Sequence, residues 1–255
     1  MTRTDRTAER TGIDRPQPVS ISVFFPCYNE QDNVRRVTEG AVKVMEGLKA
    51  DYEIILVNDG SRDHTGAIAD ELAAGNPRIK VVHHPVNRGY GAALQSGFRT
   101  AGKDLVFFSD GDGQFDLNEL PPFLELIRQY DVVCGYRRNR QDPLVRRING
   151  WCWTQLVCLL FGLRVRDIDC AFKLFRRQVL EGMTLLSTGA LISTEVLARA
   201  QRGGWSIVER PVTHYPRLAG RQTGANWRVV LRAFRELWQL RRRILSGEKE
   251  ARSKK

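Results

Sequence analysis

The chain has 255 residues, 42% of them hydrophobic, and a formal net charge of +11 at pH 7. This length is near the upper range for one α/β domain and suits a single domain with appendages. The charge is concentrated in residues 210–255, which hold thirteen Lys and Arg against three Glu. Such a segment indicates a phosphate-rich partner, meaning nucleotides, nucleic acid or an anionic membrane.

Three further features of the sequence bear on the cellular compartment and on membrane insertion. Residues 1–18 are polar and charged, lack the apolar core of a signal peptide, and are predicted to form a disordered tail. The most apolar run, 151–163, would reach about 20 Å as a helix against roughly 30 Å of hydrocarbon, so no membrane span is expected. Five cysteines without a CxxC pair indicate reduced thiols and a cytoplasmic chain.

Strands and helices alternate along the first half. The pattern predicts strands at 19–25, 52–57, 79–83 and 104–109, with an amphipathic helix from Val34 after the first of them. Strand, helix, strand is the unit of a parallel α/β sheet, whose ligands bind at the carboxyl ends of the strands. The expected fold class is therefore α/β, with a mostly parallel sheet flanked by helices.

A carboxylate motif follows the fourth strand. Asp110 and Asp112 are separated by glycine, so the backbone can turn and both side chains can converge. Together with the amide oxygen of Gln114 they suit Mg²⁺ or Mn²⁺, with positions left for substrate phosphate. An ordinary Asp/Gly turn is the alternative.

Three more polar motifs follow the other strands, at Pro26 to Glu30, Asn58 to Ser61 and Asn87 to Gly91. Glu30 also fits a plain carboxylate near the start of a helix. The third motif enters a helix through glycines and could present backbone N–H groups and Arg88 to a phosphate, although a simple glycine turn explains it too.

These four ordered motifs resemble the nucleotide-sugar half of the inverting family-two glycosyltransferases of the GT-A (Rossmann-like) fold. More narrowly, the chain resembles the branch with dolichol-phosphate mannosyltransferase and the bacterial polyprenyl-phosphate glucosyltransferases, over roughly residues 19–240. The resemblance implies a metal-dependent inverting enzyme. It would move a hexose from a GDP- or UDP-hexose to a polyprenyl (dolichyl or undecaprenyl) monophosphate.

The resemblance also implies roles for the first-half residues. The donor would be bound by Pro26, Tyr28, Glu30, Asp59, Arg88, Gly89 and Asp110. Many relatives carry Asp where this chain has Asn58, so Asp59 is the preferred contact to base or ribose. Asp112 and Gln114 would hold the ion, and Asp110 the ion or the ribose.

An arginine-rich segment follows a predicted strand at 131–136. Taken alone, 137–147 reads as a solvated loop with five arginines and one Asp. The resemblance implies that Arg137 and Arg147, or Arg146, bind the acceptor phosphate, which guanidinium groups match well. It places Asp167 at the sugar and acceptor, and leaves the roles of Asp169 and Glu195 open.

The rest of the chain supplies helices and a loop. A helix at 147–163 carries Trp151 and belongs to the core or to a membrane interface. A helix at 193–203, a strand at 205–212 and a last amphipathic helix at 226–245 are also predicted. The segment 214–224 resembles a loop that closes over the donor diphosphate, with Arg217 as its contact and Arg221 in place of a missing lysine.

The predicted organisation is a tail (1–18), a GT-A domain (19–225) and a basic C-terminal helix and tail (226–255). The domain divides into a nucleotide-sugar half (19–136) and an acceptor half (137–225). We expect a peripheral enzyme on the cytoplasmic face of a membrane, without nucleic acid, and with either a membrane-protein partner or a homo-oligomer possible. One alternative is the same fold acting on a soluble hydroxyl acceptor with Asp167 as general base. Another is a non-catalytic nucleotide-sugar or nucleic-acid binding protein.

Overall fold

The computed structural model describes residues 19–138, 144–217 and 236–244. The predicted tail at 1–18, Arg221 and the basic segment after residue 244 lie outside these residues, as do the side chain of Arg146 and most of the predicted last helix. The strands are β1 (Ser20–Cys27), β2 (Asp51–Asn58), β3 (Ile79–His83), β4 (Leu105–Ser109), β5 (Val132–Arg138), β6 (Phe172–Arg176) and β7 (Ile207–Thr213). The helices are α2 (Val34–Gly47), α3 (Thr65–Gly75), α4 (Tyr90–Thr100), η2 (Leu117–Glu119), α5 (Pro121–Leu126), α6 (Leu144–Phe161), α7 (Arg177–Leu180) and α8 (Ile192–Arg202). Residues 236–244 are also helical.

The strands form one sheet in the order β3-β2-β1-β4-β6-β5-β7. All neighbours pair in parallel except β6, which runs antiparallel to β4 and β5. The expectation of a mostly parallel α/β sheet flanked by helices is confirmed. Strand β6 was not predicted.

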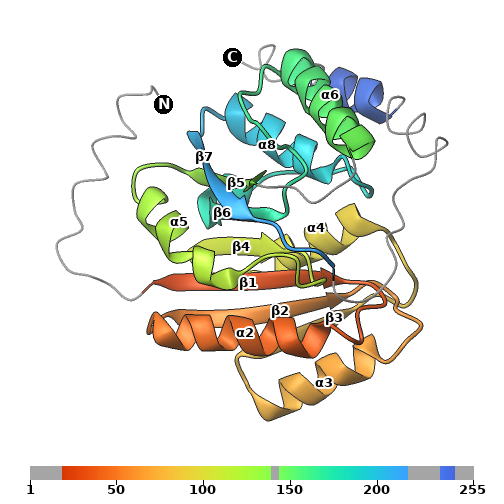
Figure 1. Cartoon of the computed structure of the whole chain (residues 1–255), viewed down its shortest axis with the longest axis vertical. Coiled ribbons are helices and arrows are strands. Elements are labelled where there is room, and N and C mark those ends of the chain that lie inside the picture. Colours follow the sequence, from red (N-terminus) through yellow and green to blue (C-terminus); the bar gives the residue numbers. More distant parts are fainter. Residues whose placement is uncertain (1–18, 139–143, 218–235, 245–255) are drawn as a thin grey trace.

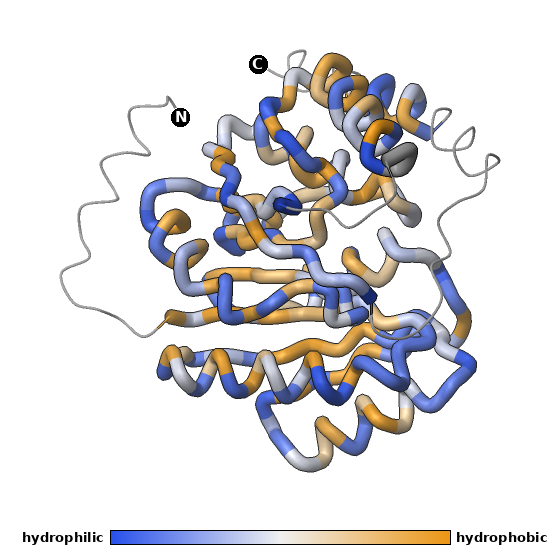
Figure 2. The backbone as a smooth tube through the Cα atoms, viewed as in Figure 1, coloured by the Kyte–Doolittle hydropathy of each residue, from blue (hydrophilic) through white to orange (hydrophobic). Residues whose placement is uncertain are grey.

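Each face of the sheet carries its own apolar core, because successive strand residues point to opposite faces. Phe25 and Phe107 pack with α2, α3 and α5 on one face. Phe24 and Phe108 pack on the other with α4, α6, α8 and the 236–244 helix. Figure 1 shows α6 beside the 236–244 helix, and Figure 2 shows apolar residues along the central strands. The sheet is thereby held rigid between two layers.

Strand register brings the predicted motifs together. Cys27 at the end of β1 is level with Asn58 at the end of β2, and Phe24 is level with Phe108 of β4. The segments that follow these strands therefore leave the sheet along one edge. None of the helices that the structure describes is long and apolar enough to cross a bilayer.

Candidate active site

A cleft of about 660 Å³ opens where β1, β2 and β4 end. Its walls include most of the residues predicted to bind the donor, namely Pro26, Tyr28, Glu30, Asp59, Gly89, Asp110 and Arg217, together with Asp112. The predicted residues Arg88 and Gln114 do not line it. Segments far apart in sequence thus build one cleft, with several charged side chains, at the carboxyl edge of the sheet.

Asp110 and Asp112 share the floor of this cleft. Burial raises the pKa of Asp110 to about 7, and the nearby charge of Asp112 adds to the shift. The hydroxyl of Tyr90 donates to Asp110 Oδ1 at 3.0 Å. Two half-buried carboxylates whose charges repel each other are a donor set that fits a hard divalent cation. No cluster of three or more His, Cys, Asp or Glu in the described ranges could cage a metal, so substrate oxygens would have to complete its shell.

The carboxylate motif is tied to the end of β7. Gln114 Nε2 donates to the carbonyl of Tyr215 at 2.9 Å, and the Gln114 carbonyl accepts from Tyr215 N at the same distance. A single antiparallel bridge joins Phe115 to His214. These contacts bring the segment after β7 over the cleft.

Arg217 lies at the end of that segment and reaches the carboxylates. It forms an ion pair with Glu30 and lies 3.9 Å from Asp112 Oδ2. Burial raises the pKa of Glu30, while Asn33, which donates at 2.8 Å, and Arg217 oppose the rise. The predicted approach of Arg217 to the donor cleft is therefore present in the structure.

Asp59 has several protein partners. Its oxygens accept from Arg88 N and Gly89 N, both at 2.9 Å, and it contacts His84 Nδ1 at 2.6 Å. His84 also contacts Ser96 Oγ at 2.9 Å. The N–H groups expected to face a phosphate therefore bind this carboxylate, and Asp59 shapes the loop that carries them. Sequence reasoning missed His84.

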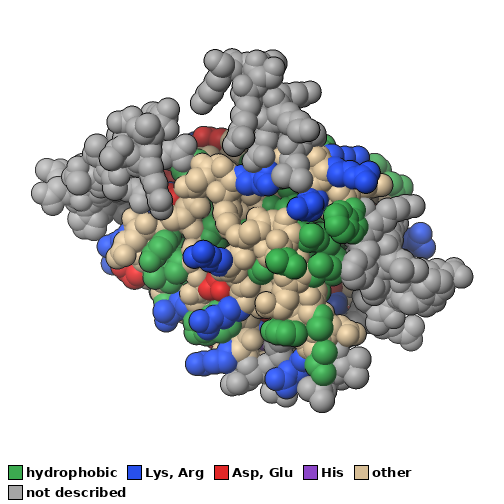
Figure 3. All heavy atoms as spheres, turned by 90° about the horizontal axis from the view of Figure 1, so that it is seen from above, with side chains coloured by type: hydrophobic (Ala, Val, Ile, Leu, Met, Phe, Trp, Pro, Cys, Tyr) green, Lys and Arg blue, Asp and Glu red, His purple; other side chains and the backbone are tan. Residues whose placement is uncertain are grey.

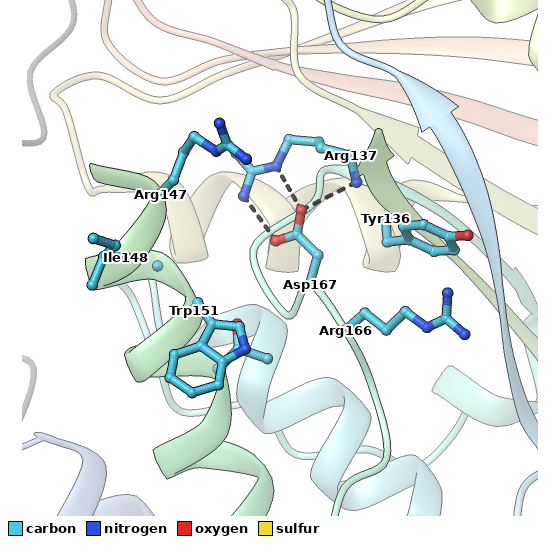
Figure 4. A pocket seen from close by; sticks show the side chains of 9 residues that line it. Tyr136, Arg137, Arg147, Ile148, Trp151, Arg166 and Asp167 are labelled. Carbon is cyan, nitrogen blue, oxygen red and sulfur yellow. Dashed lines mark hydrogen bonds and ion pairs between the residues drawn. The ribbon is translucent and has the colours of Figure 1, made fainter. Parts of the chain in front are cut away.

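A second cavity of about 400 Å³ lies beside β5 and α6 (Figure 4). It is lined by Tyr136, Arg137, Arg147, Ile148, Gly150, Trp151, Thr154, Arg166 and Asp167. The predicted acceptor residues Arg137, Arg147 and Asp167 therefore come together. Figure 4 shows the Arg147 side chain turned toward Arg137.

Arg137 and Asp167 form a two-point ion pair in this cavity. Arg137 Nε lies 2.7 Å from Oδ2 and Nη2 lies 2.8 Å from Oδ1, and Arg137 N adds a 3.2 Å hydrogen bond. Burial alone would lower the pKa of Arg137, but the hydrogen bonds and charge of Asp167 overcome it and raise the pKa. Asp167 therefore holds the guanidinium in place.

Lys173 is a buried charged residue that the sequence pattern marks only as a charge in an apolar run. The side chain is buried on β6, between the strands that lead to each cavity. Its ammonium donates to the carbonyls of Ile168, at 3.1 Å, and Cys170. The charges of Arg137 and Lys173 both act to lower the pKa of Asp110, because nearby positive charge favours the ionised carboxylate, and they oppose part of the rise caused by burial.

Comparison with known proteins places this arrangement among sugar transferases. Residues 22–184 match the family "Glycosyl transferase family 2". The chain is 34% identical over 83% of its length to "Glycosyltransferase AglD" of Haloferax volcanii, covering 35% of that protein. It is 29% identical over 89% of its length to "Dodecaprenyl-phosphate galacturonate synthase" of Rhizobium johnstonii, covering 67% of it. It is 31% identical over 85% of its length to "Undecaprenyl-phosphate 4-deoxy-4-formamido-L-arabinose transferase" of Pseudomonas fluorescens, covering 64% of it.

Solved structures share the architecture. Glucosyl-3-phosphoglycerate synthase from Mycobacterium tuberculosis, in complex with Mn²⁺, UDP and glucosyl-3-phosphoglycerate, superposes with a TM-score of 0.63 at 21% identity. The match covers 96% of this chain and 82% of that one. At this identity the likeness shows the fold. The chain spans about a third of the first of the three relatives above and about two thirds of the other two. From the match over residues 22–184, the chain belongs to glycosyl transferase family 2.

Proposed function

We propose that the chain transfers a hexose from a GDP- or UDP-hexose to a polyprenyl monophosphate at the cytoplasmic face of a membrane. The observation that carries this proposal is the composition of the second cavity. Arg137 and Arg147 supply cationic groups, while the half-exposed Ile148 and Trp151 supply an apolar side. A phosphate attached to a hydrocarbon chain matches both parts. The names of two relatives include polyprenyl phosphates, in agreement with this acceptor.

The reaction would be a single displacement. An acceptor phosphate oxygen forms the bond to the anomeric carbon, while the bond from that carbon to the diphosphate breaks and the nucleoside diphosphate leaves with the electron pair. The configuration at the anomeric carbon inverts. A phosphate monoester is already anionic near pH 7, since its second pKa is about 6, and needs no strong base. Asp167, paired with Arg137, would orient that arginine instead of removing a proton.

A divalent ion fits the first cavity. Asp110 and Asp112 would hold Mg²⁺ or Mn²⁺. Gln114, which was also predicted to bind the ion, does not line the cleft and its amide donates to Tyr215 O, so it would instead hold the segment after β7 in place. When bound, the ion would neutralise charge on the departing diphosphate. Arg217 supports the same function, because it already lies between Glu30 and Asp112 and offers a guanidinium to phosphate oxygens.

The second cavity opens beside exposed apolar side chains. Trp151 and Leu159 of α6 are 61% and 82% exposed, and Trp238 of the 236–244 helix is 52% exposed. Figure 3, which looks onto this end of the molecule, shows hydrophobic side chains interspersed with Lys and Arg. Aromatic and basic side chains together suit the headgroup region of a bilayer. We propose that residues 137–225 form the acceptor half and that this surface meets the membrane.

The donor half of the proposal can be tested by thermal shift. UDP, GDP and their hexose derivatives are added to the protein with Mn²⁺ and with excess chelator. One nucleotide series should raise the melting temperature in the presence of Mn²⁺, and the shift should shrink in chelator. No shift with any nucleotide, with or without the ion, would contradict nucleotide-sugar binding.

A further inference from the structure

Tyr90 connects a helix to the carboxylate floor of the donor cleft. It is the first residue of α4, it lines the cleft, and its hydroxyl donates to Asp110 Oδ1 at 3.0 Å. A hydrogen bond to one oxygen restricts rotation of the carboxylate and leaves the other oxygen to a ligand. The direction in which Asp110 faces therefore depends on where α4 begins.

The start of α4 is fixed by residues 186–189. Thr188 O accepts from Gly91 N at 2.8 Å and from Ala92 N at 3.3 Å, so the first turn of α4 is capped by another backbone segment. Gln95 Nε2 donates to Ser187 O at 2.9 Å. The approach is so close that a Cβ atom at Gly91 would lie 2.4 Å from Ser187 O. Position 91 therefore needs glycine for this contact.

Glu195 anchors the same segment from α8. Its side chain is fully buried, and its oxygens accept from Leu186 N at 3.0 and 3.1 Å and from Ser187 N at 2.7 Å. Arg199 neutralises it through contacts of 2.9 Å. A buried carboxylate bonded in this way holds a loop firmly, because releasing its donors would leave buried charge unpaired.

We propose that Tyr90 and Glu195 are positioning residues for Asp110, Tyr90 by direct contact and Glu195 through residues 186–189 and the first turn of α4. This inference rests on the proposed function in one respect, namely that Asp110 serves the donor and its ion. It gives a role to Glu195, which lines neither cavity. Glu53 is a matched control, because it is another buried carboxylate, held by Ser22, Lys80 and Gly102.

The first test needs no ligand. Hydrogen exchange of the amides at 91–95 is measured in the unliganded wild type, Glu195→Gln and Glu53→Gln. Relative to the other core amides, exchange in this segment should rise at least about tenfold in Glu195→Gln, whereas in Glu53→Gln it should change no more than in the rest of the core, because that variant acts on global stability. Equal exchange in wild type and Glu195→Gln would overturn the anchoring role.

The second test measures the effect on the donor site. Mn²⁺ is titrated by its electron paramagnetic resonance signal in the presence of UDP or GDP, with wild type, Tyr90→Phe, Glu195→Gln, the double variant and Glu53→Gln. Each single variant should raise the Mn²⁺ concentration for half-saturation about tenfold, and the double variant no further, because both changes act on one path. Glu53→Gln should match wild type.

Unchanged half-saturation in Tyr90→Phe, or additive effects in the double variant, would overturn the proposal. Failure of the wild type to bind either nucleotide with Mn²⁺ would instead contradict the proposed function. The hydrogen-exchange test would still decide whether Glu195 anchors residues 186–189.

Discussion

Arg137 and Asp167 form a bidentate ion pair in the wall of the second cavity, with Nε–Oδ2 and Nη2–Oδ1 distances of 2.7 and 2.8 Å. Their side chains are 15% and 10% exposed, so water competes little for the pair. A carboxylate held in this way stabilises and orients the arginine and is poorly placed to take a proton from a substrate. The geometry thus favours an acceptor that is already ionised.

Replacing Asp167 by Asn tests that interpretation. The amide keeps the shape but loses the charge that fixes Arg137, so the Michaelis constant for acceptor should rise roughly tenfold while that for donor changes little. The acidic limb of the pH profile of kcat should keep its position. If kcat instead collapses and the acidic limb disappears, Asp167 is a general base and the hydroxyl-acceptor alternative gains.

Asp112→Asn should lower the turnover number by about 10²–10³-fold, because one anionic ligand of the proposed ion is lost. Circular dichroism and melting temperature should stay close to wild type, since Asp112 is partly exposed and lies in a turn. Asp116→Asn is the control: Asp116 lies four residues away and caps η2, a role that Asn can also fill. Similar losses of turnover in both variants would mean that the substitutions disturb the turn. That result would contradict the ion-binding role assigned to Asp112.

The pH dependence of stability should depend on Glu53. Burial alone would raise its pKa, but hydrogen bonds from Lys80, Ser22 and Gly102 outweigh burial and lower the pKa below its ordinary value of 4.5. A lowered folded-state pKa gives stability that is present above 4.5 and is lost as the pH falls further. Glu53→Gln should therefore unfold more easily by about 1–3 kcal/mol at pH 7. Urea titrations at several pH values should show that the difference in unfolding free energy between wild type and Glu53→Gln becomes smaller in acid. A difference that does not change with pH would contradict the assignment.

The exposed face of α6 should contribute to membrane binding. Trp151→Ala should reduce co-sedimentation with anionic liposomes at low salt by several-fold, because an amphipathic aromatic side chain is lost from the interface. Val86→Ala removes a 64% exposed apolar side chain between β3 and α4 and should have no effect. Binding of the wild type should fall as ionic strength rises. Equal losses in both variants would place the lipid contact elsewhere.

Local sequence signals were enough for most of the first half of the fold. The strand expected at 79–83 is β3 with the same bounds, and the strand expected at 52–57 is β2 (Asp51–Asn58). Apolar periodicity marks these elements, and Gly, Asn and Asp mark their ends. The motifs after β1, β2 and β4 then had to gather, because parallel strands end at one edge.

The remainder depends on contacts between distant segments. Strand β6 holds a buried Lys173 in its second position, so its pattern did not read as a strand, and its place between β4 and β5 comes from pairing that no local rule supplies. The hydrogen bond from Tyr90 to Asp110 also could not be predicted, because the only local feature of Tyr90 is its place between two glycines. The sequence analysis predicted that Asp59 contacts the donor. The hydrogen bonds from Arg88 N and Gly89 N to Asp59 depend on the fold of the loop and could not be predicted from the sequence.

The most direct test of the central claim is transfer itself. Radiolabelled hexose from the nucleotide sugar that stabilises the protein is incubated with undecaprenyl phosphate, Mn²⁺ and either wild type, Arg147→Ala or Arg128→Ala, and the organic phase is counted. Arg128 is exposed and paired with Glu125 on the surface, so its variant serves as the matched control. We predict label in the organic phase for wild type and Arg128→Ala, loss of this label in chelator, and an acceptor Michaelis constant raised about 10–100-fold in Arg147→Ala, since a charge-assisted contact is worth roughly 1.5–3 kcal/mol. Label found in a water-soluble glycoside and absent from the lipid, or the same acceptor Michaelis constant in all three proteins, would contradict the account.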